Sequence, residues 1–308
     1  MGRLDDRICV ITGAGRGIGA ALAKTLAAQG AKLVVNDLGG AIDGSGEDQG
    51  PAREVADEIT AAGGQAVANF GDISSYEQAE GLIQQAIDTY GGVDVLINVA
   101  GILRDRMLFN MTEKEWDDVI RVHLKGTFNT SKFASIHWRA ERKGHYRMIN
   151  FTSVSGLYGN PGQPNYSAAK LGIVGFTLSS ANALGRYGVT CNAISPGAQT
   201  RMIDDIPADR RRFGIEPTQD DKRSPLNIAP PVVYLASEES DWLSGRVIGA
   251  RGYQIELVAN PVTEATIYSD KMWGIDEACE EMESVFRPLI EGKALGRYPR
   301  PYAHPQGE

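Results

Sequence analysis

Short apolar runs alternate along the chain with segments of helical periodicity, and this alternation limits the fold more than any other feature. The intervening segments carry apolar residues at i, i+3 and i+4 spacing, which is typical of amphipathic helices. Strands are expected at 8–12, 32–36, 66–70, 93–98, 147–152, 189–194 and 246–250, and helices at 17–29, 51–63, 76–90 and 113–142. This order predicts an α/β fold, a doubly wound parallel sheet with helices on both faces.

Two segments interrupt the alternation. Residues 38–50 are rich in glycine and acidic side chains, and we expect a flexible surface loop there. Residues 253–308 follow the last expected strand and contain an amphipathic helix at 274–290 and a proline-rich end. Because about 55 residues make only a marginal core alone, we expect a main domain over residues 1–252. The C-terminal extension, residues 253–308, would pack on that domain or on a partner subunit.

The composition argues against several classes of function. A net charge of −8 does not suit nucleic-acid binding, which needs clustered positive charge. No apolar run approaches the roughly 18 residues of a membrane span, and no signal segment opens the chain, so we expect a cytoplasmic protein. The three cysteines lack metal-ligand spacing, and Cys9 and Cys191 lie in apolar runs. That pattern favours buried, reduced thiols and no metal site.

A glycine-rich stretch, TGAGRGIGAAL, follows the first expected strand. Gly13, Gly17 and Gly19 lie where the strand turns into a helix, and Arg16 and Ile18 belong to the same turn. Glycines there let the backbone approach a diphosphate, which the helix N-terminus favours as an anion. Strand, helix and second strand are the context that this motif requires. We therefore expect a dinucleotide site on a Rossmann-like fold.

Asp37 bears on which dinucleotide is used. It ends the second expected strand, in the window where a carboxylate accepts hydrogen bonds from the adenosine ribose. Because a carboxylate there would repel a 2′-phosphate, NAD is favoured over NADP. Arg16 is a counter-signal, since it could meet that phosphate, and Asp37 could instead be a plain turn residue.

Further candidates for cofactor binding stand at later strand ends, the edge where open α/β sheets bind ligands. An aspartate after the third strand could bond the adenine edge, and small residues after the fourth would let the backbone approach a ribose. Taken alone, each is more often a helix cap or a turn residue. These candidates are Asp72, Ile73, Asn98, Ala100 and Gly101.

Ser153, Tyr166 and Lys170 form the candidate catalytic set. Tyr166 and Lys170 are four residues apart and so face the same side of a helix. A neighbouring ammonium lowers the pKa of a phenol, and Ser153 could hydrogen-bond the same substrate oxygen. Such a set suits hydride transfer between a secondary alcohol and a nicotinamide, with the tyrosine moving the hydroxyl proton. The alternative is helix-start packing for Tyr166 and a solvated charge for Lys170.

Together these motifs resemble the short-chain dehydrogenase/reductase family over roughly residues 5–252. The resemblance rests on TGxxxGxG at 12–19, NxAG at 98–101, Ser153, YxxxK at 166–170 and the PG of SPGAQT at 195–200. It implies that Tyr166 is the catalytic acid/base, that Lys170 lowers its pKa and binds ribose, and that Ser153 donates to the substrate oxygen. It also implies that Pro196, Gly197 and Thr200 lie beside the nicotinamide.

Several longer segments resemble one branch of that family, the (3R)-hydroxyacyl-CoA dehydrogenase unit of peroxisomal multifunctional enzyme type 2 and its stand-alone bacterial relatives. They are VVNDLGG, GILRDRM, VHLKGTF, YGNPGQPNYSAAKLG and CNAISPGAQTRM. The resemblance implies an NAD-dependent, stand-alone enzyme that forms a homodimer or homotetramer. His123 stands where the family usually has an asparagine that links the lysine to solvent; the branch shares this histidine, so a proton-relaying imidazole is compatible with turnover.

Three functions stay open at this point. The first is oxidation of a 3-hydroxyacyl-CoA, bulky or steroid-derived, in acyl-CoA or steroid side-chain degradation. The second is a hydroxysteroid or other secondary-alcohol dehydrogenase acting on a free alcohol, and the third is a non-catalytic NAD-binding scaffold. CoA would need a local basic patch, although each candidate arginine could equally be a solvated charge. The candidates are Arg104, Arg106, Arg201 and Arg210–Arg212.

Overall fold

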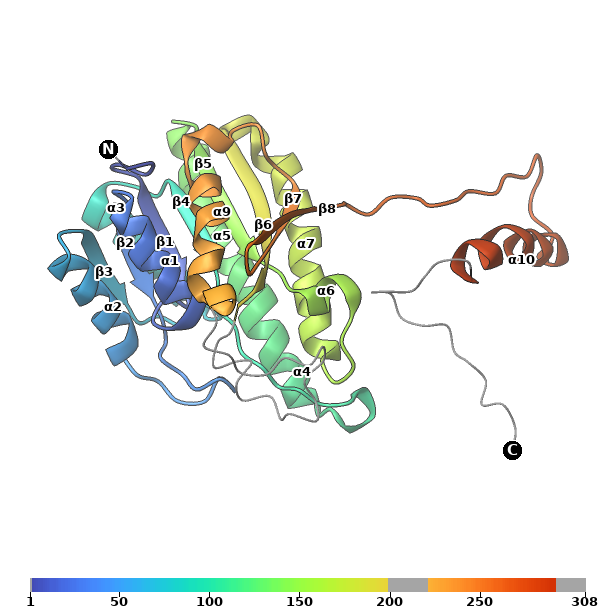
Figure 1. Ribbon diagram of the computed structural model, residues 1–308, viewed down its shortest axis with the longest axis horizontal. Helices are drawn as coiled ribbons and strands as arrows, with labels where there is room; N and C mark the ends of the chain where they lie inside the picture. Colours follow the sequence, from blue (N-terminus) through green and yellow to red (C-terminus); the bar gives the residue numbers. More distant parts are fainter. Residues whose placement is uncertain (1, 199–220, 292–308) are drawn as a thin grey trace. The chain divides into compact units, whose positions relative to one another are not determined.

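The computed structural model describes residues 2–198 and 221–291 (Figure 1). The described residues form an eight-stranded sheet in the order β3-β2-β1-β4-β5-β6-β7-β8. Strands β1 to β7 run parallel, and β8 is antiparallel to β7. The strands are β1 (Ile8–Thr12), β2 (Lys32–Asn36), β3 (Gln65–Asn69), β4 (Val95–Asn98), β5 (Tyr146–Phe151), β6 (Val189–Gly197), β7 (Arg246–Arg251) and β8 (Gln254–Val258). The strand order reverses between β1 and β4, where sheets of this kind bind ligands.

Helices cover both faces of the sheet, which confirms the predicted doubly wound α/β fold (Figure 1). Apolar residues of α1, α2 and α9 pack on one face, and those of α3 and α5 pack on the other. The alternation of side chains along each strand supplies both cores; Ile11 faces one and Val10 the other. The helices are α1 (Gly17–Ala28), α2 (Gly50–Ala61), α3 (Tyr76–Tyr90), α4 (Glu113–Ile120), α5 (Gly126–Glu141), α6 (Val154–Tyr158), α7 (Pro164–Leu184), α9 (Ala229–Ala236) and α10 (Ile275–Glu291).

The chain divides into two compact units, residues 1–258 and 259–308. The first unit contains the whole sheet, and the described part of the second contains α10. Strand β8 lies in the segment that the sequence assigned to the C-terminal extension, yet it pairs with β7 through a short turn at Gly252. None of the helices in the described part of the chain is both long and apolar enough to cross a membrane.

The helix expected over 113–142 is interrupted. Helices α4 and α5 are separated by a π-helical segment, Arg121–Lys125, so the prediction of one regular helix is wrong there. A π turn accommodates one residue more than an α turn, and such insertions are frequent at functional sites. Helix α4 packs on α7, whereas α5 packs on α3.

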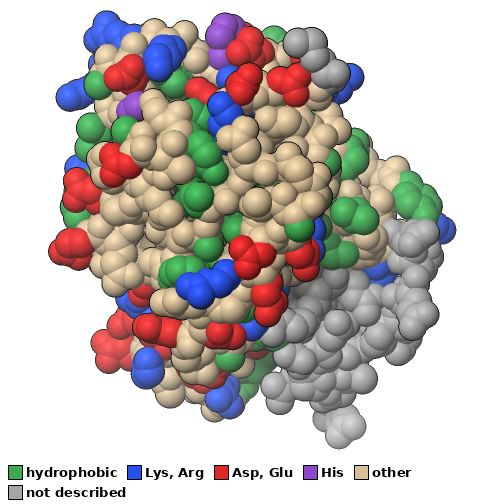
Figure 2. All heavy atoms as spheres, turned by 90° about the vertical axis from the view of Figure 1, so that its left-hand side faces the viewer, with side chains coloured by type: hydrophobic (Ala, Val, Ile, Leu, Met, Phe, Trp, Pro, Cys, Tyr) green, Lys and Arg blue, Asp and Glu red, His purple; other side chains and the backbone are tan. Residues whose placement is uncertain are grey.

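The segment between β2 and α2, residues 38–49, is a loop that contains neither helix nor strand. Backbone hydrogen bonds hold it at its neck and at its tip. At its neck the Asp48 N–H donates to the Leu38 carbonyl over 3.0 Å. At its tip the Leu103 N–H donates to the Ile42 carbonyl over 3.0 Å, so the loop is attached to the chain that follows β4. Residues 43–49 are exposed, as the sequence suggested. On the side of the molecule nearest β3, acidic and basic side chains are intermixed (Figure 2).

Candidate active site

The turn from β1 into α1 leaves the start of the helix open to an anion. Gly13 has φ +64°, and a Cβ there would lie 2.6 Å from the Ala100 Cα; at Gly19 a Cβ would overlap the Gly13 carbonyl oxygen. Helix α1 has no capping side-chain hydrogen bond at Arg16 and no acidic residue in its first turn. The unpaired N–H groups of that turn are therefore available to a ligand. These features fit the diphosphate of a dinucleotide, and Ile18 packs against the core beneath them.

Asp37 links the end of β2 to this glycine turn. Its Oδ2 accepts a hydrogen bond from the Gly15 N–H at 2.8 Å, and its Oδ1 accepts one from the Gly39 N–H at 2.7 Å. A carboxylate oxygen can accept a further bond, so both remain able to accept ribose hydroxyls. Gly15 was not singled out from the sequence, although it lies inside the quoted motif.

Arg16 points from the glycine turn toward the 38–49 loop. One guanidinium nitrogen, Nη1, lies 3.5 Å from the carbonyl oxygens of Gly39 and Gly40. The other, Nη2, lies 3.6 Å from Oδ2 of Asp48. Asp48 is a further residue that the sequence analysis missed, because nothing in an acidic glycine-rich loop distinguishes one carboxylate from the next.

The candidates at the ends of β3 and β4 have structural partners of their own. Asp72 Oδ1 accepts from the Ser74 N–H at 2.8 Å and pairs through Oδ2 with Arg121 at 3.3 Å. Asn98 is buried and donates through Nδ2 to Asn150 Oδ1 at 2.9 Å. Two backbone N–H groups after β4, those of Val99 and Ala100, donate to the Thr12 hydroxyl, and the Ile73 carbonyl accepts from Asn129.

Ser153, Tyr166 and Lys170 lie together at the carboxyl end of β5. Ser153 caps α6, accepting from the Ser155 N–H at 3.2 Å, and its hydroxyl hydrogen-bonds the Tyr166 phenol. Tyr166 is in the first turn of α7, and Lys170 follows one turn later with Nζ 5.6 Å from the centre of the phenol ring. The buried Lys170 ammonium donates to the Phe151 carbonyl at 2.7 Å.

Burial dominates the protonation of this set. It raises the pKa of the Tyr166 phenol to about 12, against the opposing hydrogen bond from Ser153, while the Asp105 charge raises it further. Burial also lowers the pKa of Lys170 to about 7. The lowered phenol pKa expected from the sequence is therefore wrong for this structure. The reason is that desolvation of the phenolate outweighs the contacts that stabilise it.

His123 lies within the π-helical segment and is 1% exposed. Its Nε2 is 2.8 Å from the Ile102 carbonyl oxygen and 3.0 Å from the Ile102 nitrogen. The ring packs edge-on against Tyr166, with centroids 5.1 Å apart. Burial, with a smaller effect of the Lys170 charge, lowers its pKa to about 3, so the imidazole is neutral at physiological pH. A Cβ on Gly101 would overlap this ring, and no signal in the sequence pairs those two residues.

The remaining candidates are only partly within the described chain. Pro196 and Gly197 end β6 and pair with Ala250 and Arg251 of β7. Thr200, Arg201 and Arg210–Arg212 lie outside the described residues. Two of the arginines proposed for a CoA site are already paired: Arg104 with Asp43 and Asp118, and Arg106 with Glu115.

Comparisons with known proteins identify the family of this chain. The family model for short chain dehydrogenase matches residues 7–211. Hydroxyacyl-CoA dehydrogenase ChsB1 of Mycobacterium tuberculosis is 42% identical over 304 residues, covering 94% of this chain and 90% of that protein. Peroxisomal multifunctional enzyme type 2 of Mus musculus is 39% identical over 239 residues, 78% of this chain but 31% of that longer protein.

Solved structures include a similar chain. A short chain dehydrogenase from Mycobacterium avium superposes with a TM-score of 0.81 at 43% sequence identity. The match covers 98% of this chain and 100% of that one. The fold of this chain thus has a close structural counterpart.

Proposed function

The chain belongs to the short chain dehydrogenase family, and we propose that it oxidises the 3-hydroxyl group of a (3R)-hydroxyacyl-CoA to a ketone with NAD. Enzymes of this family are oxidoreductases that use NAD or NADP and act on small molecules. The observation that carries the proposal is the cluster of Ser153, Tyr166 and Lys170 at the carboxyl edge of the sheet, beside a glycine turn that fits a diphosphate.

In the proposed reaction Tyr166 takes the proton of the substrate hydroxyl. Ser153 donates a hydrogen bond to the same oxygen, and Lys170, which spends one N–H on the Phe151 carbonyl, keeps two for the cofactor ribose. When bound, oxidised nicotinamide accepts the hydride and brings a positive charge that favours phenolate. That charge opposes the desolvation that otherwise keeps Tyr166 protonated.

Asp37 supports NAD as the cofactor. Its carboxylate stands at the end of β2, where it can accept ribose hydroxyls and where a 2′-phosphate would meet a like charge. We assign the rest of the cofactor site to the glycine turn and to the strand ends described above. The full set is Gly13, Arg16, Gly17, Ile18, Gly19, Asp72, Ile73, Asn98, Ala100, Gly101, Tyr166, Lys170, Pro196, Gly197 and Thr200.

The choice of an acyl-CoA over a free alcohol is supported by the name of one relative, a hydroxyacyl-CoA dehydrogenase. Similarity to peroxisomal multifunctional enzyme type 2 agrees with the branch that the sequence resembles. The ion pairs of Arg104 and Arg106 weigh against those two arginines as CoA ligands, since CoA phosphates would have to compete with Asp118 and Glu115. A free secondary alcohol is therefore the second candidate substrate. A homodimer or homotetramer and a cytoplasmic location remain predictions.

NADH formation with a panel of (3R)- and (3S)-hydroxyacyl-CoAs and free 3-hydroxysteroids would test the proposal. We expect turnover of the (3R) thioesters, whereas activity on free alcohols alone would exclude the acyl-CoA assignment. Tyr166→Phe removes only the phenol oxygen, so we expect kcat to fall about a thousandfold or more while the Kd for NAD changes less than about threefold. Turnover retained in Tyr166→Phe would refute the assignment of the acid/base.

A further inference from the structure

The 38–49 loop brings a second carboxylate to the glycine turn. Its neck is closed by the Asp48 N–H bond to Leu38, and a Cβ on Gly39 would overlap the Asp48 carbonyl, so the two arms of the loop touch. This closure brings Asp48, far from Asp37 along the loop, to the same end of the sheet. Asp37 reaches the Gly15 N–H, and Asp48 reaches the side chain of the next residue, Arg16.

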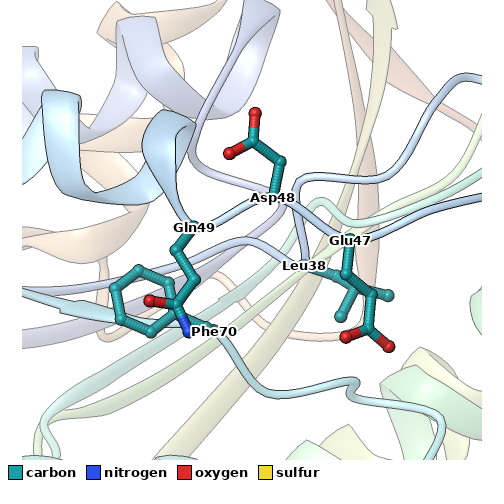
Figure 3. A pocket seen from close by; sticks show the side chains of 5 residues that line it. All are labelled: Leu38, Glu47, Asp48, Gln49 and Phe70. Carbon is teal, nitrogen blue, oxygen red and sulfur yellow. The ribbon is translucent and has the colours of Figure 1, made fainter.

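The loop also borders a hollow of about 230 Å³ lined by Leu38, Glu47, Asp48, Gln49 and Phe70 (Figure 3). Within it the side chains of Asp48 and Glu47 point in opposite directions (Figure 3). Asp48 is the one within ion-pair distance of Arg16, at 3.6 Å. The carbonyl oxygens of Gly39 and Gly40 face the same guanidinium, so the loop presents Arg16 with a carboxylate and two dipoles.

This contact adds little to folding stability. The Arg16 and Asp48 side chains are 37% and 58% exposed, and ion pairs of such exposure contribute little to stability because water screens them. The ion pair matters more for an anionic ligand than for stability. In the proposed function, Arg16 is the cation of the turn that binds the cofactor diphosphate. A 2′-phosphate carries a charge of about −1.5 to −2 and needs an available cation.

We propose that Asp48 selects NAD over NADP by holding Arg16 against the 38–49 loop and neutralising it. This inference rests on the proposed function, and it adds a specificity-determining residue to it. Asp37 repels the 2′-phosphate from one side, and Asp48 withholds the arginine that would otherwise attract it. In the sequence Arg16 suggested NADP, because an arginine there could bind the 2′-phosphate. Asp48, 32 positions later, would neutralise that arginine.

The chain offers a matched control for this effect. Asp43 lies in the same loop and its loss changes the net charge by the same amount, but it pairs with Arg104 at 3.5 Å instead of Arg16. Asp48→Asn and Asp43→Asn therefore separate a local effect on Arg16 from a general change in charge. Arg16→Ala, alone and combined with Asp48→Asn, tests whether the effect of Asp48 passes through Arg16.

Equilibrium dissociation constants for NAD and for NADP, measured by titration calorimetry on the intact protein and on each variant, test the inference without any turnover. We expect Asp48→Asn to tighten NADP binding about fivefold, with NAD binding within about twofold of wild type. Asp43→Asn should leave both constants unchanged. In the Arg16→Ala background, Asp48→Asn should change NADP binding less than about twofold.

The inference is overturned if Asp48→Asn leaves NADP binding unchanged, if Asp43→Asn tightens it equally, or if the gain persists without Arg16. These outcomes leave the proposed function intact so long as the wild-type protein binds NAD. A wild-type protein that binds neither dinucleotide would instead refute the proposed function, and the inference with it.

Discussion

The two ends of the candidate site differ in their access to water. At the tyrosine end, Lys170 and His123 are almost completely buried, and burial raises the pKa of Tyr166 and lowers the pKa values of Lys170 and His123. At the loop end, Arg16 and Asp48 are substantially exposed, and their ion pair is screened. Substitutions at the tyrosine end should therefore have large effects on rate and stability. Those at the loop end should act on ligand choice through small energies.

Among variants that keep the Tyr166 phenol, the largest effect should come from the loss of the hydrogen bond between Ser153 and Tyr166. In the substrate-free enzyme this bond favours the phenolate, so Ser153→Ala should raise the pKa of Tyr166 there. The ascending limb of the kcat/KM profile for alcohol oxidation, which reports the free enzyme, should move to higher pH. With the lost contact to the substrate oxygen, kcat should fall about a hundredfold.

Ser167→Ala is the control for that experiment. Ser167 directly follows Tyr166 in the sequence, and its hydroxyl is buried. Within residues 2–198 and 221–291 this hydroxyl has no hydrogen-bond partner. Its removal should leave the pH profile in place. An unshifted profile in Ser153→Ala would contradict the role of that hydrogen bond.

The next effect tests how tightly the tyrosine end is packed. Gly101→Ala would push a methyl group into the His123 ring, so we expect the free energy of unfolding in urea to fall by about 2–3 kcal/mol. The loss should shrink in a His123→Ala background, where the ring is absent. Gly81→Ala in α3 is the control, since a Cβ there meets nothing within 4 Å and should stabilise the helix slightly.

His123 should also make stability depend on pH. Its pKa is about 3 in the folded protein, below the value of about 6.5 expected when unfolded, so the unfolded state binds the extra proton between these values. Lowering the pH from 7 to 5 should therefore cost the wild-type protein about 2 kcal/mol that His123→Asn does not lose. Urea unfolding of both proteins at the two pH values measures this difference. Equal pH dependence in both would show that burial of the imidazole is not what lowers stability.

The smallest effect is expected at the loop end. Asp48→Asn should change the free energy of unfolding by less than about 1 kcal/mol, because its partner is exposed. If Asp48→Asn lowered the free energy of unfolding as much as Gly101→Ala, the loop end would be as sensitive to substitution as the tyrosine end, which would contradict the difference described above. The same urea titrations measure both variants.

At the tyrosine end, the sequence predicts which side chains adjoin better than it predicts their protonation. Tyr166 and Lys170 could be placed together because a spacing of four on a helix determines which side chains adjoin. The phenol pKa could not be predicted, because it depends on burial and on Asp105, which approaches from another part of the chain. The attachment of the 38–49 loop was equally invisible, since backbone hydrogen bonds such as Leu103 to Ile42 leave no trace in residue type.

The sheet shows the same limit. Strands β1 and β2 match their predicted ranges, because buried parallel strands are continuous apolar runs. Strand β8 was missed because it is a short, partly exposed edge strand. Its charged Glu256 is less exposed than its apolar neighbour Leu257, which is the reverse of the usual pattern of apolar residues inside and charged residues outside. The π-helical segment also escapes pattern reading, because one added residue hardly alters the apolar spacing of the helices around it.

That added residue has a consequence for how the chain tolerates change in length. A π turn fits one residue more than an α turn into the helix, and each residue of a regular helix accounts for about 100° of rotation. Helix α4 meets α7 while α5 meets α3. Many substitutions in the segment could preserve this arrangement, but deletion of any one of its residues would turn one helix away from its partner. Within 121–125, the number of residues is therefore under stronger constraint than the identity of most of them.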